Sequence, residues 1–210
     1  MELLKDRIDA GKQLSKRLLE YKKKNAIVLA IPRGGVIVGN EIAKALDIKL
    51  DIIVPRKIGS PEDPEFAIGA VAPDGSISLA EDIVSSYKIS ETYIRNKVKE
   101  EIQEIKRRME AYRGKKPLPK LRNKIVILVD DGVATGNTII ASAKFIKKQK
   151  PKKIVIAVSV APSDFINKVS SMVDEVISLK PLEPYYAISM HYISFEQTED
   201  EEVIEILKNY

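Results

Sequence analysis

Short apolar runs, rich in Ile and Val, recur along the chain. They cover residues 26–31, 50–54, 125–129, 154–160 and 175–179. Runs of this length without polar alternation are typical of parallel strands that are covered on both faces. The pattern therefore predicts five buried strands.

Helical periodicity fills several of the gaps between these runs. Residues 36–46, 138–148 and 164–172 follow the first, third and fourth runs, and residues 3–18 form an amphipathic leading segment. Thr198 and Glu201 have the spacing of a capping box, which predicts the start of a last helix. Strands that alternate with helices predict an α/β fold, a mostly parallel sheet flanked by helices with right-handed crossovers.

The segment 58–120 interrupts this alternation and is too long for a simple loop, so it predicts an insertion with elements of its own. Residues 66–71 and 76–79 flank a turn sequence centred on Asp74, which indicates a hairpin. Ser90 can cap a helix that runs to about Arg113. That helix would carry one apolar stripe, formed by Ile94, Val98, Ile102, Ile105, Met109 and Tyr112. The stripe predicts that the helix docks against the domain or against a partner subunit. We expect one domain over residues 1–210.

Composition excludes several kinds of chemistry. The chain has no cysteine, which rules out disulfides, thiolate metal sites and cysteine nucleophiles. Its single histidine, His191, cannot build a histidine triad or a multi-histidine metal site, and we interpret it as structural. No run reaches the roughly 18 apolar residues of a membrane span. We expect a cytoplasmic protein.

The net charge of +5 raises the question of an anionic partner. Lysines cluster at residues 22–24 and 147–153. Both clusters fall at predicted helix ends, where cations complement the helix dipole. A solvated surface is therefore favoured, and a nucleic-acid partner is not expected.

The strongest chemical signal follows the third apolar run. It consists of Asp130, Asp131, Gly132, Val133, Ala134, Thr135, Gly136, Asn137 and Thr138. A helix that begins here has unpaired N–H groups and a positive dipole end, which suit a phosphate. A Walker A loop would need a Gly-Lys-Ser/Thr ending, which is absent, so a nucleoside triphosphatase is disfavoured. The two carboxylates can accept vicinal hydroxyls or support a hydrated Mg²⁺, although strand-end aspartates also cap turns.

This segment resembles the signature of the type I phosphoribosyltransferase family, in which a hydrophobic strand is followed by two acidic residues, a short turn and Thr-Gly-x-Thr. The resemblance implies that Asp130 and Asp131 bind the ribose hydroxyls of phosphoribosyl diphosphate. It also implies that residues 133–138 wrap the 5-phosphate. Gly132 departs from the pattern, because many members carry a larger apolar residue there.

Two further motifs match in the family's order. Ile31, Pro32, Arg33, Gly34 and Gly35 resemble the diphosphate loop, which often contains a strained non-proline peptide. After the second run, Arg56 and Lys57 resemble a basic pair that reaches the diphosphate. Each of these cations alone could equally be an ordinary charge at a strand end.

The resemblance implies a Mg²⁺-dependent enzyme that transfers the phosphoribosyl group to a nitrogen acceptor, such as a nucleobase, and releases diphosphate. The catalytic residues would be Asp130, Asp131, Arg33 and Lys57, and the two aspartates would hold the metal indirectly, through water and substrate. A C-terminal hood at about 180–198 would place Tyr185 and Tyr186 against the acceptor. Because members of this family usually form dimers, the resemblance also implies a homodimer.

A closer likeness extends over the whole chain to stand-alone phosphoribosyltransferase-domain proteins of bacteria and archaea with unassigned acceptors. Their pattern includes residues 64–69 and 184–186. Two alternatives stay open. One is a regulator that senses phosphoribosyl diphosphate or a nucleotide and binds RNA or a protein. The other is a hydrolase that uses the same phosphate loop.

Overall fold

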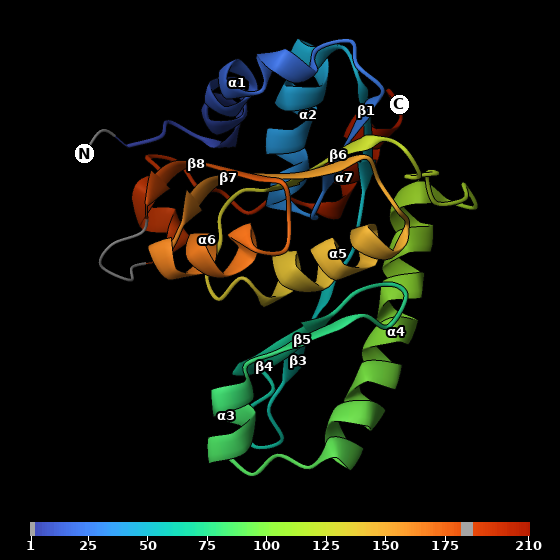
Figure 1. Cartoon of the computed structure of the whole chain (residues 1–210), viewed down its shortest axis with the longest axis vertical. Coiled ribbons are helices and arrows are strands. Elements are labelled where there is room, and N and C mark those ends of the chain that lie inside the picture. The colour runs from blue at the N-terminus through green and yellow to red at the C-terminus, as the bar shows by residue number, and fades with distance from the viewer. Residues whose placement is uncertain (1–2, 182–186) are drawn as a thin grey trace.

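The computed structural model of the chain describes residues 3–181 and 187–210. Its centre is a five-stranded sheet in the order β2-β1-β6-β7-β8, and every neighbouring pair is parallel (Figure 1). These strands are β1 (Ala26–Ala30), β2 (Lys49–Ile52), β6 (Ile125–Asp130), β7 (Lys153–Ala161) and β8 (Glu175–Pro181). The predicted α/β fold with a mostly parallel sheet is confirmed.

Helices cover both faces of this sheet (Figure 1). One face packs against α1 (Arg7–Arg17), α2 (Gly34–Leu46) and α7 (Asp200–Leu207), and the other packs against α5 (Asn137–Lys148) and α6 (Ser163–Ser170). Alternate residues of β1 divide between the two cores, with Val28 on the first side and Leu29 on the second. Two-sided burial explains why the strands are uniformly apolar.

Both ends of the chain differ from the prediction. Helix α1 begins at Arg7 rather than residue 3, because the side chain of Asp6 caps it by accepting from the Asp9 N–H at 2.7 Å. Leu4 instead forms an isolated parallel β-bridge with Tyr192. The capping box predicted for the last helix is wrong, since Thr198 is buried and lies before the N-cap of α7, which makes no side-chain capping bond.

The insertion contains a second sheet and two helices. Its antiparallel strands are β3 (Arg56–Gly59), β4 (Ala67–Val71) and β5 (Ile77–Leu79), and they are followed by α3 (Glu81–Ser86) and α4 (Glu91–Arg113). The β4–β5 hairpin and the Ser90 cap, which accepts from the Tyr93 N–H at 3.2 Å, are confirmed. Strand β3 and helix α3 were not predicted.

The apolar stripe of α4 packs within this chain. Ile94, Ile105 and Tyr112 are buried, and the rest of the stripe lies partly buried against the same core. The stripe is therefore a docking face for the domain itself. It gives no support to a dimer.

Candidate active site

A cavity of about 950 Å³ opens between the carboxyl ends of the parallel strands and the insertion. Its walls come from the β1–α2 and β6–α5 loops, from β3, β4 and α4, and from the C-terminal segment. All the described residues predicted to bind the donor line it except Gly35, which is buried behind the strand end. Sequence-distant motifs thus meet at the edge where α/β sheets bind ligands.

The β6–α5 loop is held from two sides and leaves the start of α5 open to the cavity. The Val133 N–H donates to the Val160 carbonyl oxygen at 2.8 Å, and Gly136 takes φ +77° as the N-cap of α5. The buried side chain of Asn137 accepts from Ser78 Oγ at 2.9 Å, so this side chain anchors the loop to β5. Residues 135–138 line the cavity at the start of α5, where a helix has N–H groups without intrahelical partners and the positive end of its dipole.

Asp130 and Asp131 stand where β6 ends. Burial, and then the neighbouring charge of Asp131, raises the pKa of Asp130 well above its usual range. Asp131 Oδ2 accepts from Arg7 Nε at 2.7 Å, with side chains only 15% and 12% exposed respectively. A Cβ at Gly34 would collide with both groups of this pair, which explains why the β1–α2 loop needs a glycine there.

Arg7 was not predicted, and it connects three parts of the site. Besides pairing with Asp131, its guanidinium lies 3.8 Å from the centroid of the Phe195 ring and donates to the Glu196 carbonyl oxygen at 2.6 Å. The Tyr192 hydroxyl donates to the Asp131 carbonyl oxygen at 2.7 Å. Arg7 and Asp131 are 124 positions apart, so no local pattern could have revealed the pair.

Two of the three predicted diphosphate cations have acidic partners. Arg33 lies 3.5 Å from Asp200 Oδ1, which also accepts from the Tyr112 hydroxyl at 2.5 Å. Burial, and then this hydrogen bond, raises the pKa of Tyr112 to about 12. The peptide bond between Pro32 and Arg33 is cis, in agreement with the unusual non-proline peptide expected in this loop.

The cations that follow the second parallel strand lie on β3. Arg56 Nε donates to Glu101 Oε2 at 2.9 Å, whereas Lys57 is exposed and forms no ion pair with a described residue. Lys97 pairs with Glu101 at 3.4 Å, and Arg108 lines the same wall. The apolar stripe of α4 predicted a docking role only, although the polar face of this helix forms part of the cavity.

The predicted acceptor residues Tyr185 and Tyr186 lie outside the described residues. Next to that segment, Ile188 covers Gly132, where an added Cβ would lie 2.5 Å from Ile188 Cγ2. An apolar side chain from the C-terminal segment thus occupies the space that a larger residue at this turn would need. His191 accepts from the Leu4 N–H through its carbonyl oxygen at 3.0 Å, and its ring Nε2 is buried with no hydrogen-bond partner among the described residues.

A model of the phosphoribosyl transferase domain matches residues 2–182. The chain belongs to this family. A Mycobacterium tuberculosis (strain H37Rv) protein named "Putative phosphoribosyl transferase Rv0571c" is 37% identical over 207 residues, which cover 99% of this chain and 47% of that protein. The chain thus spans about half the length of the curated relatives it matches.

Solved structures share the fold of this chain. Protein TT1426 from Thermus thermophilus is 32% identical with a TM-score of 0.81, over 100% of this chain and 99% of that one. A hypoxanthine phosphoribosyltransferase from Staphylococcus aureus is 14% identical with a TM-score of 0.50, over 86% and 77% of the two chains, and this likeness concerns the fold alone.

Few side chains among the described residues are placed to bind a metal ion. Over residues 3–181 and 187–210, three or more His, Asp or Glu side chains nowhere gather as a metal site. Asp130 and Asp131 fit the other mode of Mg²⁺ binding, in which one or two carboxylates assist water and substrate oxygens. Within the same residues, no helix has both the length and the apolar composition to cross a membrane.

Proposed function

We propose that this protein transfers the 5-phosphoribosyl group of phosphoribosyl diphosphate to a nitrogen acceptor, such as a nucleobase, and releases diphosphate. One observation carries the proposal. A single cavity brings together an open helix start, two carboxylates at a strand end, Arg33 from the β1–α2 loop, and Arg56 and Lys57 from β3. These groups correspond in order to a phosphate, a ribose and a diphosphate.

Each group has a role that follows from its chemistry. Residues 133–138 wrap the 5-phosphate, which lies against the N–H groups at the positive end of α5. Asp130 and Asp131 accept hydrogen bonds from the ribose hydroxyls, and Arg7 holds Asp131 in place for this contact. Arg33, Arg56 and Lys57 bind the diphosphate, with the two arginines oriented by acidic partners.

Electrostatic stabilisation suffices for the reaction. When the bond between the anomeric carbon and the diphosphate breaks, positive charge develops on the ribose and negative charge on the leaving group. The two carboxylates stabilise the first charge, and Arg33 and Lys57 stabilise the second. Mg²⁺, held by Asp130 and Asp131 through water and substrate oxygens, would supply further charge neutralisation at the diphosphate. No nucleophilic side chain is required.

The acceptor would approach from the C-terminal side of the cavity, because the donor occupies the two loops. Tyr185 and Tyr186 follow the end of β8 in sequence and would stack a planar base there. Replacing each with alanine should reduce acceptor affinity and spare donor binding. If both variants keep wild-type acceptor kinetics, the β4–β5 hairpin is the better candidate for the acceptor-binding wall.

The decisive experiment combines the protein with phosphoribosyl diphosphate, Mg²⁺ and a panel of purine, pyrimidine, nicotinate, xanthine and anthranilate-type acceptors, and measures released diphosphate. Release that depends on one acceptor supports the proposal. Release without any acceptor indicates the hydrolase, and binding without turnover indicates the regulator. A homodimer also remains a proposal, which light scattering would test.

Donor binding can be tested separately from turnover. Phosphoribosyl diphosphate should raise the melting temperature, because a ligand that binds only the folded state stabilises it. The variant Asp130→Asn/Asp131→Asn should lose this shift, while Glu20→Gln/Glu110→Gln, which removes two exposed carboxylates, should keep it. A full shift in the double asparagine variant would mean that these carboxylates do not hold ribose.

A further inference from the structure

The edge of the sheet opposite the cavity carries a large excess of positive over negative charge. We define the basic edge as residues 22–25, 47–49, 114–124, 147–153 and 171–175, which lead into β1, β2, β6, β7 and β8. It contains fourteen Lys and Arg against three Asp and Glu, so its net charge is +11 in a chain whose total is +5. The rest of the chain is therefore net negative.

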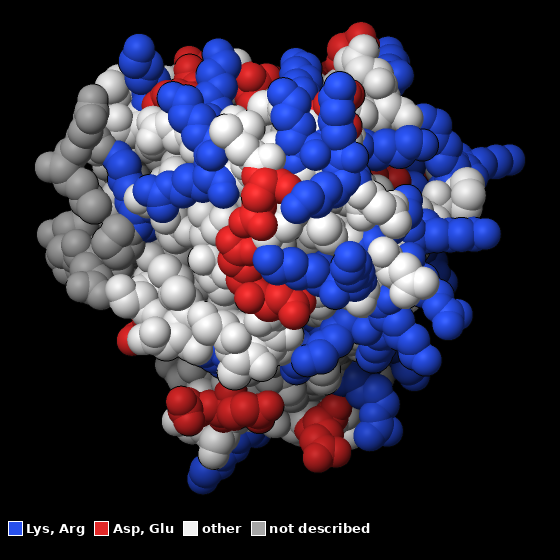
Figure 2. Space-filling model, turned by 45° about the horizontal axis from the view of Figure 1, so that its top comes forward, with Lys and Arg blue, Asp and Glu red and all other residues white. Residues whose placement is uncertain are grey.

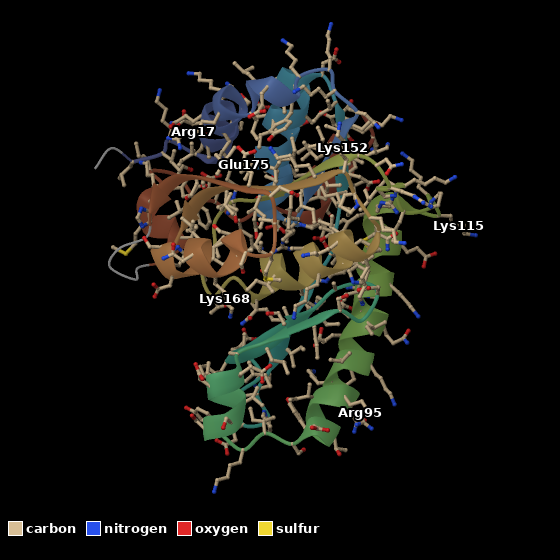
Figure 3. All side chains as sticks on the ribbon, viewed as in Figure 1. Arg17, Arg95, Lys115, Lys152, Lys168 and Glu175 are labelled. Carbon is tan, nitrogen blue, oxygen red and sulfur yellow. The ribbon has the colours of Figure 1, made fainter. Side chains whose placement is uncertain are left out.

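The fold joins clusters that are separate in the sequence. Because parallel strands all begin at the same edge, the lysines before β1 and before β7 lie on one side of the molecule. Figure 2 shows Lys and Arg side chains concentrated on the right of that view, and Figure 3 labels Lys115 and Lys152 on the same side. The sequence interpretation had treated the clusters as independent helix ends.

The loops of the basic edge are fixed to one another by their backbones. N–H groups donate to carbonyl oxygens of adjacent loops, from Lys23 to Leu46, from Asn123 to Lys150 and from Lys152 to Lys124, at 2.9, 3.1 and 2.8 Å. The cations therefore project from a rigid base. Binding a partner would not require ordering these loops, which reduces its entropic cost.

Few of these cations are neutralised by neighbouring acids. Within the described residues, the ion pairs of the basic edge are Lys23 with Asp47 at 3.8 Å, Lys148 with Asp74 at 3.0 Å and Lys153 with Glu175 at 2.7 Å. Each of the four segments that contain Lys or Arg has at least one exposed cation without an ion pair to a described residue, and Lys22, Lys49, Arg122 and Lys152 represent them, one from each segment.

Helix dipoles explain only a small part of this charge. Helices α1, α2, α4, α5 and α6 all precede segments of the basic edge, and each carries about half a negative charge at its C-terminus. Together they offset about two to three charges, against a net +11. The remaining charge destabilises the fold by self-repulsion, which makes an anionic partner the better explanation.

We propose that the basic edge binds the phosphate backbone of a nucleic-acid duplex, independently of base sequence. Across β2, β1, β6 and β7, three strand spacings of about 4.8 Å span roughly 14 Å, over which a duplex carries about eight charges. Single strands would need aromatic side chains for stacking, but the exposed aromatic residues of the described chain are Phe66 and Tyr87, in the insertion. A membrane would favour apolar anchors, and the described basic edge exposes one large apolar side chain, Leu118.

The test measures fluorescence anisotropy of labelled 20-base-pair DNA and RNA duplexes of the same sequence. About four phosphate contacts, one for each loop, predict a slope near −4 in log affinity against log salt and roughly a 100-fold loss between 50 and 200 mM salt. The variant Lys22→Glu/Lys49→Glu/Arg122→Glu/Lys152→Glu should abolish binding at 50 mM salt. The control Lys12→Glu/Lys16→Glu/Lys99→Glu/Lys106→Glu makes the same change in net charge at exposed helix positions and should still bind.

The proposal is supported if the wild-type protein binds either duplex and only the basic-edge variant loses this binding. Comparing the affinities for DNA and RNA then identifies the preferred duplex. Equal weakening in both variants, or no duplex binding at 50 mM salt, overturns it. Binding to vesicles of phosphatidylserine but not to duplexes also overturns it, in favour of a membrane. Urea midpoints check that both variants fold, and the corresponding Gln substitutions replace any that do not.

Discussion

Replacing Arg7 with methionine tests whether the unpredicted ion pair organises the candidate active site. Methionine keeps much of the apolar stem of arginine but removes the charge. The change deletes the 2.7 Å contact with Asp131, the bond to the Glu196 carbonyl oxygen and the contact with the Phe195 ring. Asp131, whose side chain is only 15% exposed, would become a mostly buried carboxylate without this counterion.

The expected cost follows from the burial of the pair. Breaking a buried ion pair by removing one partner costs about 3–5 kcal/mol. Since the two side chains are still 12% and 15% exposed, the lower end of this range applies. We therefore expect Arg7→Met to lower the free energy of unfolding by about 3 kcal/mol, which in a chain of this size lowers the melting temperature by roughly 6–12 °C.

Urea unfolding of Arg7→Met, Asp131→Asn and the double variant isolates the pair from the other lost contacts. Residues in direct contact couple by about 0.5–3 kcal/mol, and we expect a value above about 1 kcal/mol. Arg95→Met, which removes an exposed arginine from α4 (Figure 3), is the matched control and should cost less than about 0.5 kcal/mol. A coupling below about 0.5 kcal/mol, or an Arg7→Met variant as stable as the control, would refute the reasoning.

Three further predictions concern the loops. Asp130→Asn should stabilise the ligand-free protein at pH 7, because the raised pKa of Asp130 means that its charged form opposes folding. This gain in stability should vanish below about pH 3, where the carboxyl is protonated in both the folded and the unfolded state. Urea unfolding at the two pH values would measure the difference. Arg33→Ala and Lys57→Ala should weaken diphosphate binding far more than nucleoside monophosphate binding by calorimetry, and slow any turnover about 100-fold; equal weakening of both ligands would contradict their assignment. Gly136→Ala should destabilise the protein by more than about 1 kcal/mol in urea, because φ is +77° and the new Cβ would collide with the Phe165 ring; an unchanged midpoint would contradict the loop geometry.

Features that depend on neighbouring residues in the sequence were predictable. The parallel strands are uniformly apolar because both faces are covered, and the β6–α5 loop combines its carboxylates, glycine and threonines within nine positions. The β4–β5 hairpin was predictable because its turn residues are local. Strand β3 was not, because it has only four residues and begins with two cations, which were interpreted as diphosphate ligands.

Features that depend on strand order and on distant contacts could not be predicted. The pairing of Arg7 with Asp131 requires α1, the β1–α2 loop and the end of β6 to meet. Asp200 and Glu101 look like ordinary helix-surface acids until the fold places them beside Arg33 and Arg56. The basic edge likewise exists only because the parallel order aligns loops that are far apart in the sequence.

The hydrogen bond between Ser78 and Asn137 links the insertion mechanically to the β6–α5 loop. Asn137 is the first residue of α5, and its side chain is bound to the middle residue of β5. An anion that orders the start of α5 should therefore also restrict local opening of the β4–β5 hairpin. Amide hydrogen exchange in that hairpin should slow when an anion occupies the loop. The exchange rates of these backbone N–H groups would then detect ligand binding even if the groups do not contact the ligand.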